Sequence, residues 1–489
     1  MSATFFGHPR GLATLFFTEM WERFTYYGMR AVLVLFLVAA VASGGLGLDD
    51  KTATAIYGLF TAGVYLAALP GGWVADRLIG ARRAVLLGGI VIALGNSLLA
   101  LSTTARGFYV GLATIVAGVG LLKPNVSAMV ADLYPEGGAR RDAGFTVFYM
   151  GINLGAMLGP FVTAESQELF GQRAGFGAAA IGMALGVIQY HFTQRHLGDA
   201  GGGPTETAVG RPRPWRLLLG SVVVAVLVGT ALWFGWLAVD PLSVAHAATF
   251  VIAATALLFF SWVFVAGKLS PEERRRTLVI IVLFLASALF WSGYEQAGSS
   301  LNLFAERYTQ RTLAALHFVV PAGWFQALEP IYVIVFAPLV AWLWIALARR
   351  RLNPSAPAKF AIGVLLMGSG FLVMAAAAEI VAHGSKVLPY WLIFTYLLHT
   401  FGELCLSPVG LSYLTKLAPK RLVGQMMGMW FLSLSLGNLA AGLFAGELDV
   451  NNLAAMPGQY MHVVYFALGL GGALLLLVRP VKRLMGTVE

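Results

Sequence analysis

The chain has 489 residues, of which 58% are hydrophobic and only 11% are charged. A soluble globular domain carries roughly 25% charged residues, so this composition argues against a soluble enzyme. It also excludes a disordered chain, because disordered chains are poor in apolar and aromatic residues. The net charge of +10 would suggest a nucleic-acid partner in a soluble protein, but the basic residues stand between long apolar runs. The sequence therefore predicts an all-α polytopic membrane protein.

Fourteen membrane spans are predicted along the chain, because a spanning helix needs about 20 mostly apolar residues. The first six are predicted at 12–40, 52–76, 84–101, 107–133, 143–163 and 174–194. Two more follow at 216–238 and 245–267, and the last six at 277–298, 321–348, 359–382, 389–415, 424–446 and 459–478. The pattern is six spans, then two, then six.

This pattern divides the chain into four predicted parts. They are an N-terminal six-helix bundle at 1–195, a cytoplasmic linker at 196–214, an inserted helix pair at 215–268 and a C-terminal six-helix bundle at 269–489. Two six-helix halves are typical of a secondary transporter, whose substrate site lies between the halves near the middle of the membrane. The inserted pair carries no charge within either apolar run, and no chemistry is assigned to it.

The distribution of lysine and arginine predicts the orientation. With the N-terminus inside, predicted cytoplasmic segments hold about four times as many Lys and Arg residues as the opposite segments. This bias follows the positive-inside rule. Both termini are therefore expected in the cytoplasm, and the protein is expected to be a multi-pass protein of the bacterial cytoplasmic (inner) membrane.

The first span carries Glu19, Glu22, Arg23 and Arg30. Each ionised group at the bilayer centre costs roughly 2.5–3.5 kcal/mol on insertion scales. Glu19 lies three residues before Glu22 and four before Arg23, so the two acids and the base share one helix face. A static salt bridge that fixes helix packing is one interpretation. Two acids that share one base leave a carboxylate unpaired, however, which favours a functional cluster.

Later spans add one base and three acids, namely Lys123, Glu295, Glu329 and Glu403. The buried set then holds five acids against three bases, so at least one acid should hold or exchange a proton. The signs are also separated, because Arg30 and Lys123 belong to the first half and the three later acids to the second. A substrate with an anionic end and a cationic end could bridge the halves. The charges therefore predict a proton-coupled carrier.

Several motifs resemble one transporter family. Residues 19–28, EMWERFTYYG, resemble the ExxERFxYYG motif of the proton-dependent oligopeptide transporter family. Residues 145–155 resemble the second signature of that family, and 71–83 the loop that major facilitator proteins carry between their second and third helices. The similarity continues through 290–296, 402–408 and 424–431, so it covers nearly the whole chain. It implies the major facilitator fold and symport of di- and tripeptides with protons.

The same resemblance implies roles for individual residues. Glu19, Glu22 and Arg23 correspond to the proton-coupling cluster, and Lys123 and Glu295 to a salt bridge between the halves. Arg30 and Lys123 would hold the peptide carboxylate, and Glu403 the peptide amino group. Residues that match cavity-lining positions are Tyr26, Tyr27, Tyr65, Asn153, Trp291 and Trp430. The basic loop after the second helix, with Asp76, Arg77, Arg82 and Arg83, would assist gating. Glu329, also expected at the substrate site, stands where relatives often have asparagine.

Two other transporter functions remain open at this point, a multidrug/proton antiporter and a transporter of nitrate or other small anions. The paired bases Arg30 and Lys123 suit an organic cation poorly. An intramembrane enzyme would need clustered aspartates for a metal-bound diphosphate, and only Asp49 and Asp50 are adjacent. We therefore expect a transporter and not an enzyme, without a cofactor or metal and with protons as the coupling ion. Its expected partners are di- and tripeptides and the lipid bilayer, without nucleic acid, and it is expected to work as a monomer.

Overall fold

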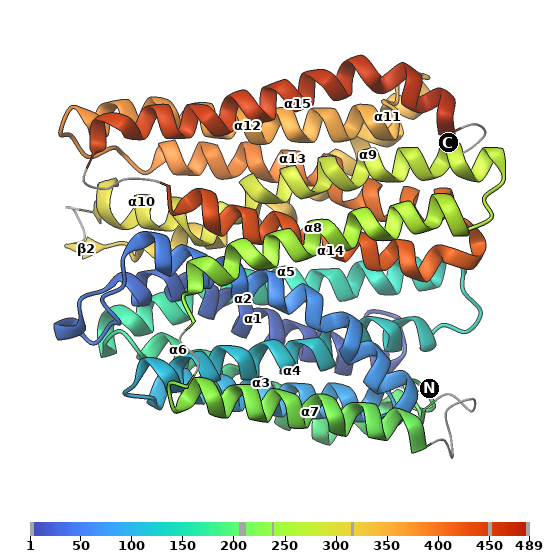
Figure 1. Cartoon of the computed structure of the whole chain (residues 1–489), viewed down its shortest axis with the longest axis horizontal. Coiled ribbons are helices and arrows are strands. Elements are labelled where there is room, and N and C mark those ends of the chain that lie inside the picture. The colour runs from blue at the N-terminus through green and yellow to red at the C-terminus, as the bar shows by residue number, and fades with distance from the viewer. Residues whose placement is uncertain (1–3, 205–211, 237–238, 314–316, 448–451, 486–489) are drawn as a thin grey trace. The chain divides into compact units, whose positions relative to one another are not determined.

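The computed structural model describes residues 4–204, 212–236, 239–313, 317–447 and 452–485. Nearly all of this chain is helical, and the helices within each unit run along a common direction (Figure 1). The chain forms two compact units. Unit 1 consists of Met1–Leu48 and Gly63–Asp240, and unit 2 of Asp49–Ala62 and Pro241–Glu489. Part of the predicted linker, 205–211, and the end of the predicted span 216–238 lie outside the described residues.

The prediction of about fourteen spans is confirmed. Thirteen helices in the described chain are long and apolar enough to cross a membrane. The fourteenth is α1, Arg10–Val38, whose 29 residues would also span a bilayer at 1.5 Å per residue. It carries four charged residues away from its ends, Glu19, Glu22, Arg23 and Arg30. The cytoplasmic location of the termini stays a prediction.

Unit 1 holds most of the first half of the chain. Its elements are α1 (Arg10–Val38), η1 (Val41–Ser43), η2 (Ala75–Ile79), α3 (Ala81–Leu101), α4 (Ala105–Asp132), α5 (Gly138–Phe170), α6 (Ala174–Thr193), η3 (Gln194–Leu197) and α7 (Pro212–Trp233). Helix α2 (Asp50–Val74) contributes to both units, since its start packs within unit 2 and its end within unit 1.

Unit 2 holds the second half. Its helices are α8 (Pro241–Ala266), α9 (Pro271–Tyr294), η5 (Glu295–Gly298), α10 (Ser300–Tyr308), η7 (Ala322–Ala327), α11 (Leu328–Arg349), α12 (Ala356–Ala382), α13 (Tyr390–Leu417), η8 (Lys420–Leu422), α14 (Val423–Ala445), η9 (Leu453–Ala455) and α15 (Met456–Met485). A short antiparallel pair, β1 (Thr312–Leu313) and β2 (Phe318–Val319), follows α10.

Local sequence explains where several helices begin and end. Ser270 caps α9 by accepting from the backbone N–H of Glu273, and the Glu273 carboxylate accepts from the N–H of Ser270. Pro271, the first residue of α9, is suited to that position because it has no N–H to leave unpaired. Helix α5 ends at Phe170 and is followed by Gly171, whose φ of 98° lies in the left-handed region that favours glycine. Helix α9 therefore begins before the apolar run predicted at 277–298, and α5 ends after the run predicted at 143–163.

Glycines bring α1 and α5 into close contact. A Cβ atom at Gly155 would collide with the carbonyl oxygen of Met20, and one at Gly159 with that of Phe24. The hydroxyl of Thr163 donates to the carbonyl of Gly28 at 2.7 Å, which ties the same two helices together. Small residues permit this approach in lipid, where helices associate by packing and by hydrogen bonds. The charged face of α1 is thus held on a rigid partner.

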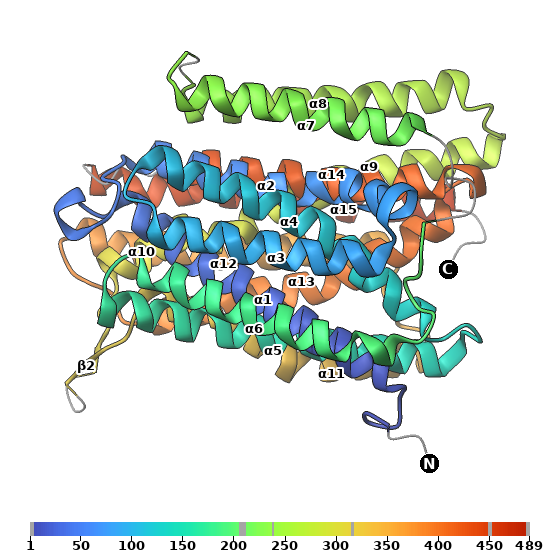
Figure 2. The ribbon, with the colours of Figure 1, turned by 90° about the horizontal axis from the view of Figure 1, so that it is seen from below.

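The inserted helices α7 and α8 bury little of their surface. None of the apolar stretch of α7 is buried, and only 22% of that of α8. Figure 2 shows α7 far from α5 and α6 of its own unit. Arg106 at the start of α4 donates to the carbonyl of Trp233 at 2.7 Å and so holds the end of α7. Such burial is typical of helices that face lipid.

Replacing Gly155 by alanine should destabilise the protein, because the new methyl group meets backbone and cannot be accommodated by a side-chain rotation. Overpacking of this kind costs about 1–3 kcal/mol. Thermal unfolding of the purified protein in detergent measures the effect as a lowered midpoint. Gly177→Ala is the matched control, since its Cβ would lie 3.9 Å from Ala100 in ordinary contact. Equal midpoints for the two variants would contradict the packing argument.

Candidate functional site

One guanidinium lies between two buried carboxylates on α1. Arg23 Nε donates to Oε1 of Glu19 at 2.8 Å and lies 2.7 Å from Oε2 of Glu22. All three residues are buried, with exposed fractions of 5% or less. The spacing of these residues along the helix places them on one face, as the sequence predicts. The structure thus brings together three of the predicted proton-coupling residues.

This cluster is incompletely satisfied. Among the described residues, Oε2 of Glu19, Oε1 of Glu22 and one terminal nitrogen of Arg23 have no hydrogen-bond partner. A buried ionised group without partners is costly, and one guanidinium neutralises only one of two carboxylates. The arrangement therefore leaves one negative charge of the trio to be balanced by another cation or by a proton.

Each cation of unit 1 that was predicted at the site lies over a tyrosine ring. The distances to the ring centroids are 5.7 Å from Arg23 to Tyr26, 5.2 Å from Arg30 to Tyr27 and 4.1 Å from Lys123 to Tyr65. Tyr26 and Tyr27 also meet edge to face at 5.3 Å. A desolvated cation gains energy over an aromatic face. The three predicted tyrosines are therefore partners of the three predicted bases.

Asn153 and Lys123 come from the helices on either side of this cluster. Asn153 is buried on α5, where its amide nitrogen donates to the carbonyl of Tyr149 at 3.0 Å. Lys123 is half-buried on α4, directly before Pro124. The predicted pairing of Lys123 with Glu295 joins residues of different units and stays a prediction.

In unit 2, the helix that carries Glu295 is interrupted at that residue. Helix α9 ends at Tyr294, η5 covers Glu295–Gly298, and α10 begins at Ser300. Gln296 steadies the break, because its amide donates to the Ser292 carbonyl and accepts from the Ser300 hydroxyl at 2.8 Å. Glu295 is buried within it. Interrupted helices are common at the substrate and ion sites of transporters.

A hydrogen bond connects α9 to Glu403 of α13. The hydroxyl of Tyr294 donates to Oε2 of Glu403 at 2.6 Å. The short distance is that of a charge-assisted O–H···O bond. Tyr294 was not among the predicted residues, and its position next to Glu295 was the only signal in the sequence. It positions the carboxylate that was predicted to hold the peptide amino group.

The remaining predicted residues of unit 2 are also buried. Trp291 and Trp430 lie on α9 and α14, and Glu329 lies in the first turn of α11. A carboxylate in a first turn is stabilised by the helix dipole. The indole N–H of Trp291 has no acceptor among the described residues. The predicted site residues of unit 2 thus include three acids, Glu295, Glu329 and Glu403, and no lysine or arginine.

The predicted gating loop contains a π-helical turn. Asp76 and Arg77 are exposed within η2, and Arg83 is exposed on α3. Arg82 instead donates to the carbonyls of Ala200, at 2.7 Å, and Gly198. The backbone N–H of Gly201 donates to Asp132 at 3.1 Å, so this start of the predicted linker is held against α3 and α4. Three of the four predicted gating residues are therefore exposed, whereas Arg82 is held by backbone carbonyls.

An ion pair that the sequence analysis missed fastens the start of α2 to α10. Arg307 donates from both terminal nitrogens to the two oxygens of Asp50, at 2.6 and 2.8 Å. The residues are 257 positions apart and both side chains are largely covered. A bidentate pair adds geometric specificity. Nothing in the sequence spacing could have revealed it.

Comparison with known proteins shows the family. The model of the POT family matches residues 82–457. The "Peptide transporter YePEPT" of Yersinia enterocolitica is 41% identical, over 99% of this chain and 97% of its own length. The "Di-/tripeptide transporter" of Lactococcus lactis subsp. cremoris is 35% identical over 99% and 98%. The chain therefore belongs to the POT family, and it is a multi-pass protein of the inner membrane.

Solved structures agree with this assignment. The crystal structure of peptide transporter POT in complex with sulfate superposes with a TM-score of 0.91 at 40% identity, covering 99% of this chain and 97% of that one. A POT family transporter in complex with 5-aminolevulinic acid gives 0.88 at 32% identity, covering 98% of each chain. The predicted family and fold class are thus confirmed. The similarities do not favour the antiporter or the small-anion transporter.

A double-mutant cycle on Asp50 and Arg307 should give a coupling free energy of about 1–3 kcal/mol, because the pair is bidentate and mostly covered. The variants are Asp50→Asn, Arg307→Gln and the double variant, and thermal unfolding in detergent gives each stability. The pair Glu272–Arg276 serves as control, since Glu272 is mostly exposed and such pairs contribute about 0.3–0.5 kcal/mol. Additive effects at Asp50 and Arg307 would refute a structural role for the pair.

Proposed function

We propose that the protein carries di- and tripeptides together with protons across the inner membrane by alternating access. The single observation that carries the coupling is the position of Arg23 between Glu19 and Glu22. The names of the relatives support the peptide substrate. The trio leaves one carboxylate charge unbalanced inside the membrane, and a proton from outside is the simplest partner for it.

The distribution of charge supports a peptide as the substrate. The predicted set in unit 1 has three bases and two acids, whereas that in unit 2 has Glu295, Glu329 and Glu403 alone. A peptide zwitterion offers a carboxylate to Arg30 and Lys123 and an ammonium group to Glu403. A carboxylate has two acceptor oxygens, so in this proposal Glu403 accepts from the Tyr294 hydroxyl and from the peptide ammonium group.

In the proposed cycle, Lys123 and Glu295 close the cytoplasmic side while the carrier faces outward. Protonation of Glu22 or Glu295 weakens this pair, and the peptide carboxylate competes for Lys123. The halves then rock, and peptide and proton leave together because neither alone balances the charge of the site. Coupling thus rests on exchange of ionic partners, which requires that the two states differ in their contacts with each ligand.

Glu22→Gln should abolish peptide uptake driven by a proton gradient while leaving some counterflow exchange. The amide preserves the shape of the side chain but cannot take up and release the proton. Purified protein in liposomes with an imposed pH gradient and labelled dipeptide measures both activities. Glu379→Gln is the control, because Glu379 is an exposed acid near the end of α12. Driven uptake by Glu22→Gln at the wild-type rate would remove Glu22 from coupling.

Glu329→Gln should reduce uptake of a lysine-containing dipeptide more than that of dialanine. The buried Glu329 carboxylate is one of three acids among the predicted site residues of unit 2, which favours a substrate with an extra cation. Loss of one charged hydrogen bond costs about 1.5–3 kcal/mol, so the ratio of the two uptake rates should shift about tenfold or more. Competition assays in the same liposomes measure it, again against Glu379→Gln. An equal loss for both peptides would show that Glu329 does not select for charge.

A further inference from the structure

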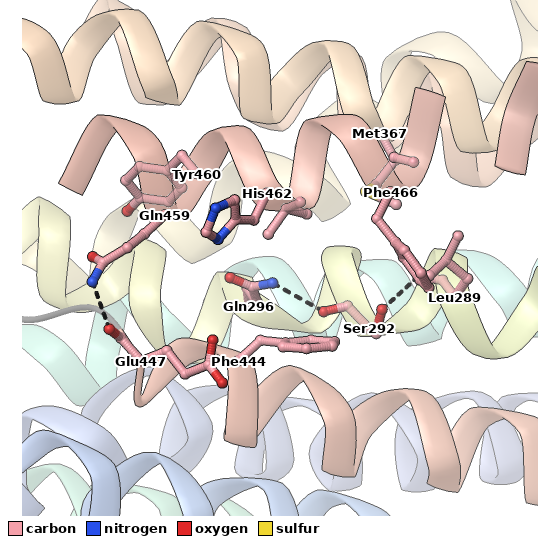
Figure 3. Close-up of a pocket in the computed structure, with 12 residues that line it drawn as sticks. Leu289, Ser292, Gln296, Met367, Phe444, Glu447, Gln459, Tyr460, His462 and Phe466 are labelled. Carbon is pink, nitrogen blue, oxygen red and sulfur yellow. Dashed lines mark hydrogen bonds between the residues drawn. The ribbon is translucent and has the colours of Figure 1, made fainter. Parts of the chain in front are cut away.

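A cavity of about 320 Å³ lies within unit 2, and none of the predicted site acids Glu295, Glu329 and Glu403 is among the residues that line it. Its walls come from α9, α12, α14 and α15. Figure 3 shows α14 and α15 on opposite sides, with Ser292 of α9 and Gln296 of η5 between them. This volume is at the lower end of the range for small-molecule sites. The proposed transport cycle does not use it.

The two ends of this cavity differ in chemistry. Figure 3 shows Glu447, Gln459, Tyr460 and His462 gathered toward one end. Toward the other end are apolar side chains, including Leu289 and Phe466. Phe466 is 62% exposed, so the apolar end is open at the surface of the helices. A molecule with a polar head and an apolar tail matches this division.

The hydroxyl of Tyr460 lacks a partner at the polar end. Tyr460 is only 1% exposed, and its ring packs between those of Phe304 and Phe371, with centroid distances of 6.2 and 6.1 Å. Its hydroxyl has no hydrogen-bond partner among the described residues. Ser292, by contrast, donates to a backbone carbonyl within α9. Because buried hydroxyls are normally bonded, the free Tyr460 hydroxyl indicates a ligand.

The charge at the mouth identifies the kind of ligand. Glu447 is exposed there, and Gln459 donates to its backbone carbonyl at 2.8 Å, which holds the mouth in shape. None of the described lining residues is a lysine or arginine, and His462 is the remaining titratable group besides Tyr460. The mouth thus suits a headgroup with a cation better than one with only negative charge.

We propose that this cavity binds one phospholipid whose headgroup carries a primary amine, as in phosphatidylethanolamine. The ammonium group lies at Glu447, and an ester or phosphate oxygen accepts from the hydroxyl of Tyr460. One acyl chain follows the apolar wall past Leu289 and Phe466. The bound lipid would fill the space between α14 and α15 and join them without a direct helix contact.

Native mass spectrometry of the detergent-purified protein tests this proposal without any transport measurement. After addition of phosphatidylethanolamine, phosphatidylcholine or phosphatidylglycerol, the wild type should retain one phosphatidylethanolamine in preference to the other two. Val463→Trp fills the cavity from α15 and should abolish this retention. Leu476→Trp is the matched control on the same helix, since Leu476 is 83% exposed and does not line the cavity.

Tyr460→Phe keeps the ring and removes only the hydroxyl, so it provides a test even if Val463→Trp fails to fold. It should lower the apparent affinity for phosphatidylethanolamine about fivefold, as expected for one lost hydrogen bond. Equal lipid retention by Val463→Trp and Leu476→Trp would overturn the proposal and indicate nonspecific surface lipid. Retention of phosphatidylglycerol equal to that of phosphatidylethanolamine would also overturn the proposal, as would an unchanged affinity in Tyr460→Phe. A dimer in which a second copy of the chain covers the cavity would overturn it as well.

Discussion

The ion pairs of Arg23 with Glu19 and Glu22 are the constraint on which the proposed function depends. Two carboxylates and one guanidinium are buried on a helix long enough to span the membrane, at 2.8 and 2.7 Å. A bilayer tolerates such groups only when their charges are balanced. Because two carboxylates share one guanidinium, the proposed function links the charge state of the trio to the transport of a proton. The ring of Tyr26 near Arg23 adds a further contact without changing the net charge.

The rest of the structure holds this trio and its counterparts in place. Glycines of α5 approach the backbone of α1 so closely that the charged face of α1 cannot turn away. In unit 2, the short helix η5 at Glu295–Gly298 interrupts the α-helical geometry between α9 and α10. The hydroxyl of Tyr294 positions Glu403 by a hydrogen bond. Of the predicted site residues, the bases Arg23, Arg30 and Lys123, each over a tyrosine ring, belong to unit 1, and the acids Glu295, Glu329 and Glu403 belong to unit 2. In the proposed function, a zwitterionic peptide matches that separation.

Local patterns in the sequence predicted the membrane spans and the charged cluster of α1. Contacts between residues far apart in the chain could not be predicted from such patterns. Apolar runs of about 20 residues predicted the fourteen spans, and three- and four-residue spacing predicted that Glu19, Glu22 and Arg23 share a face. The bond from Tyr294 to Glu403 joins residues 109 apart, and the pair Asp50–Arg307 joins residues 257 apart. Arg82 was predicted as a gating residue from its motif, yet its guanidinium binds backbone carbonyls, which no side-chain pattern encodes. Contacts of this kind depend on how helices pack.

The most direct test of coupled transport is to record the internal pH of liposomes that contain the purified protein, with no pH gradient or membrane potential at the start. A sudden inward gradient of dipeptide is then imposed. If peptide and proton move together, the interior acidifies, and the initial rate of acidification rises and saturates with peptide concentration. Entry of labelled peptide without any acidification would contradict the account, because the charge of the buried trio would then be unconnected to movement of the substrate.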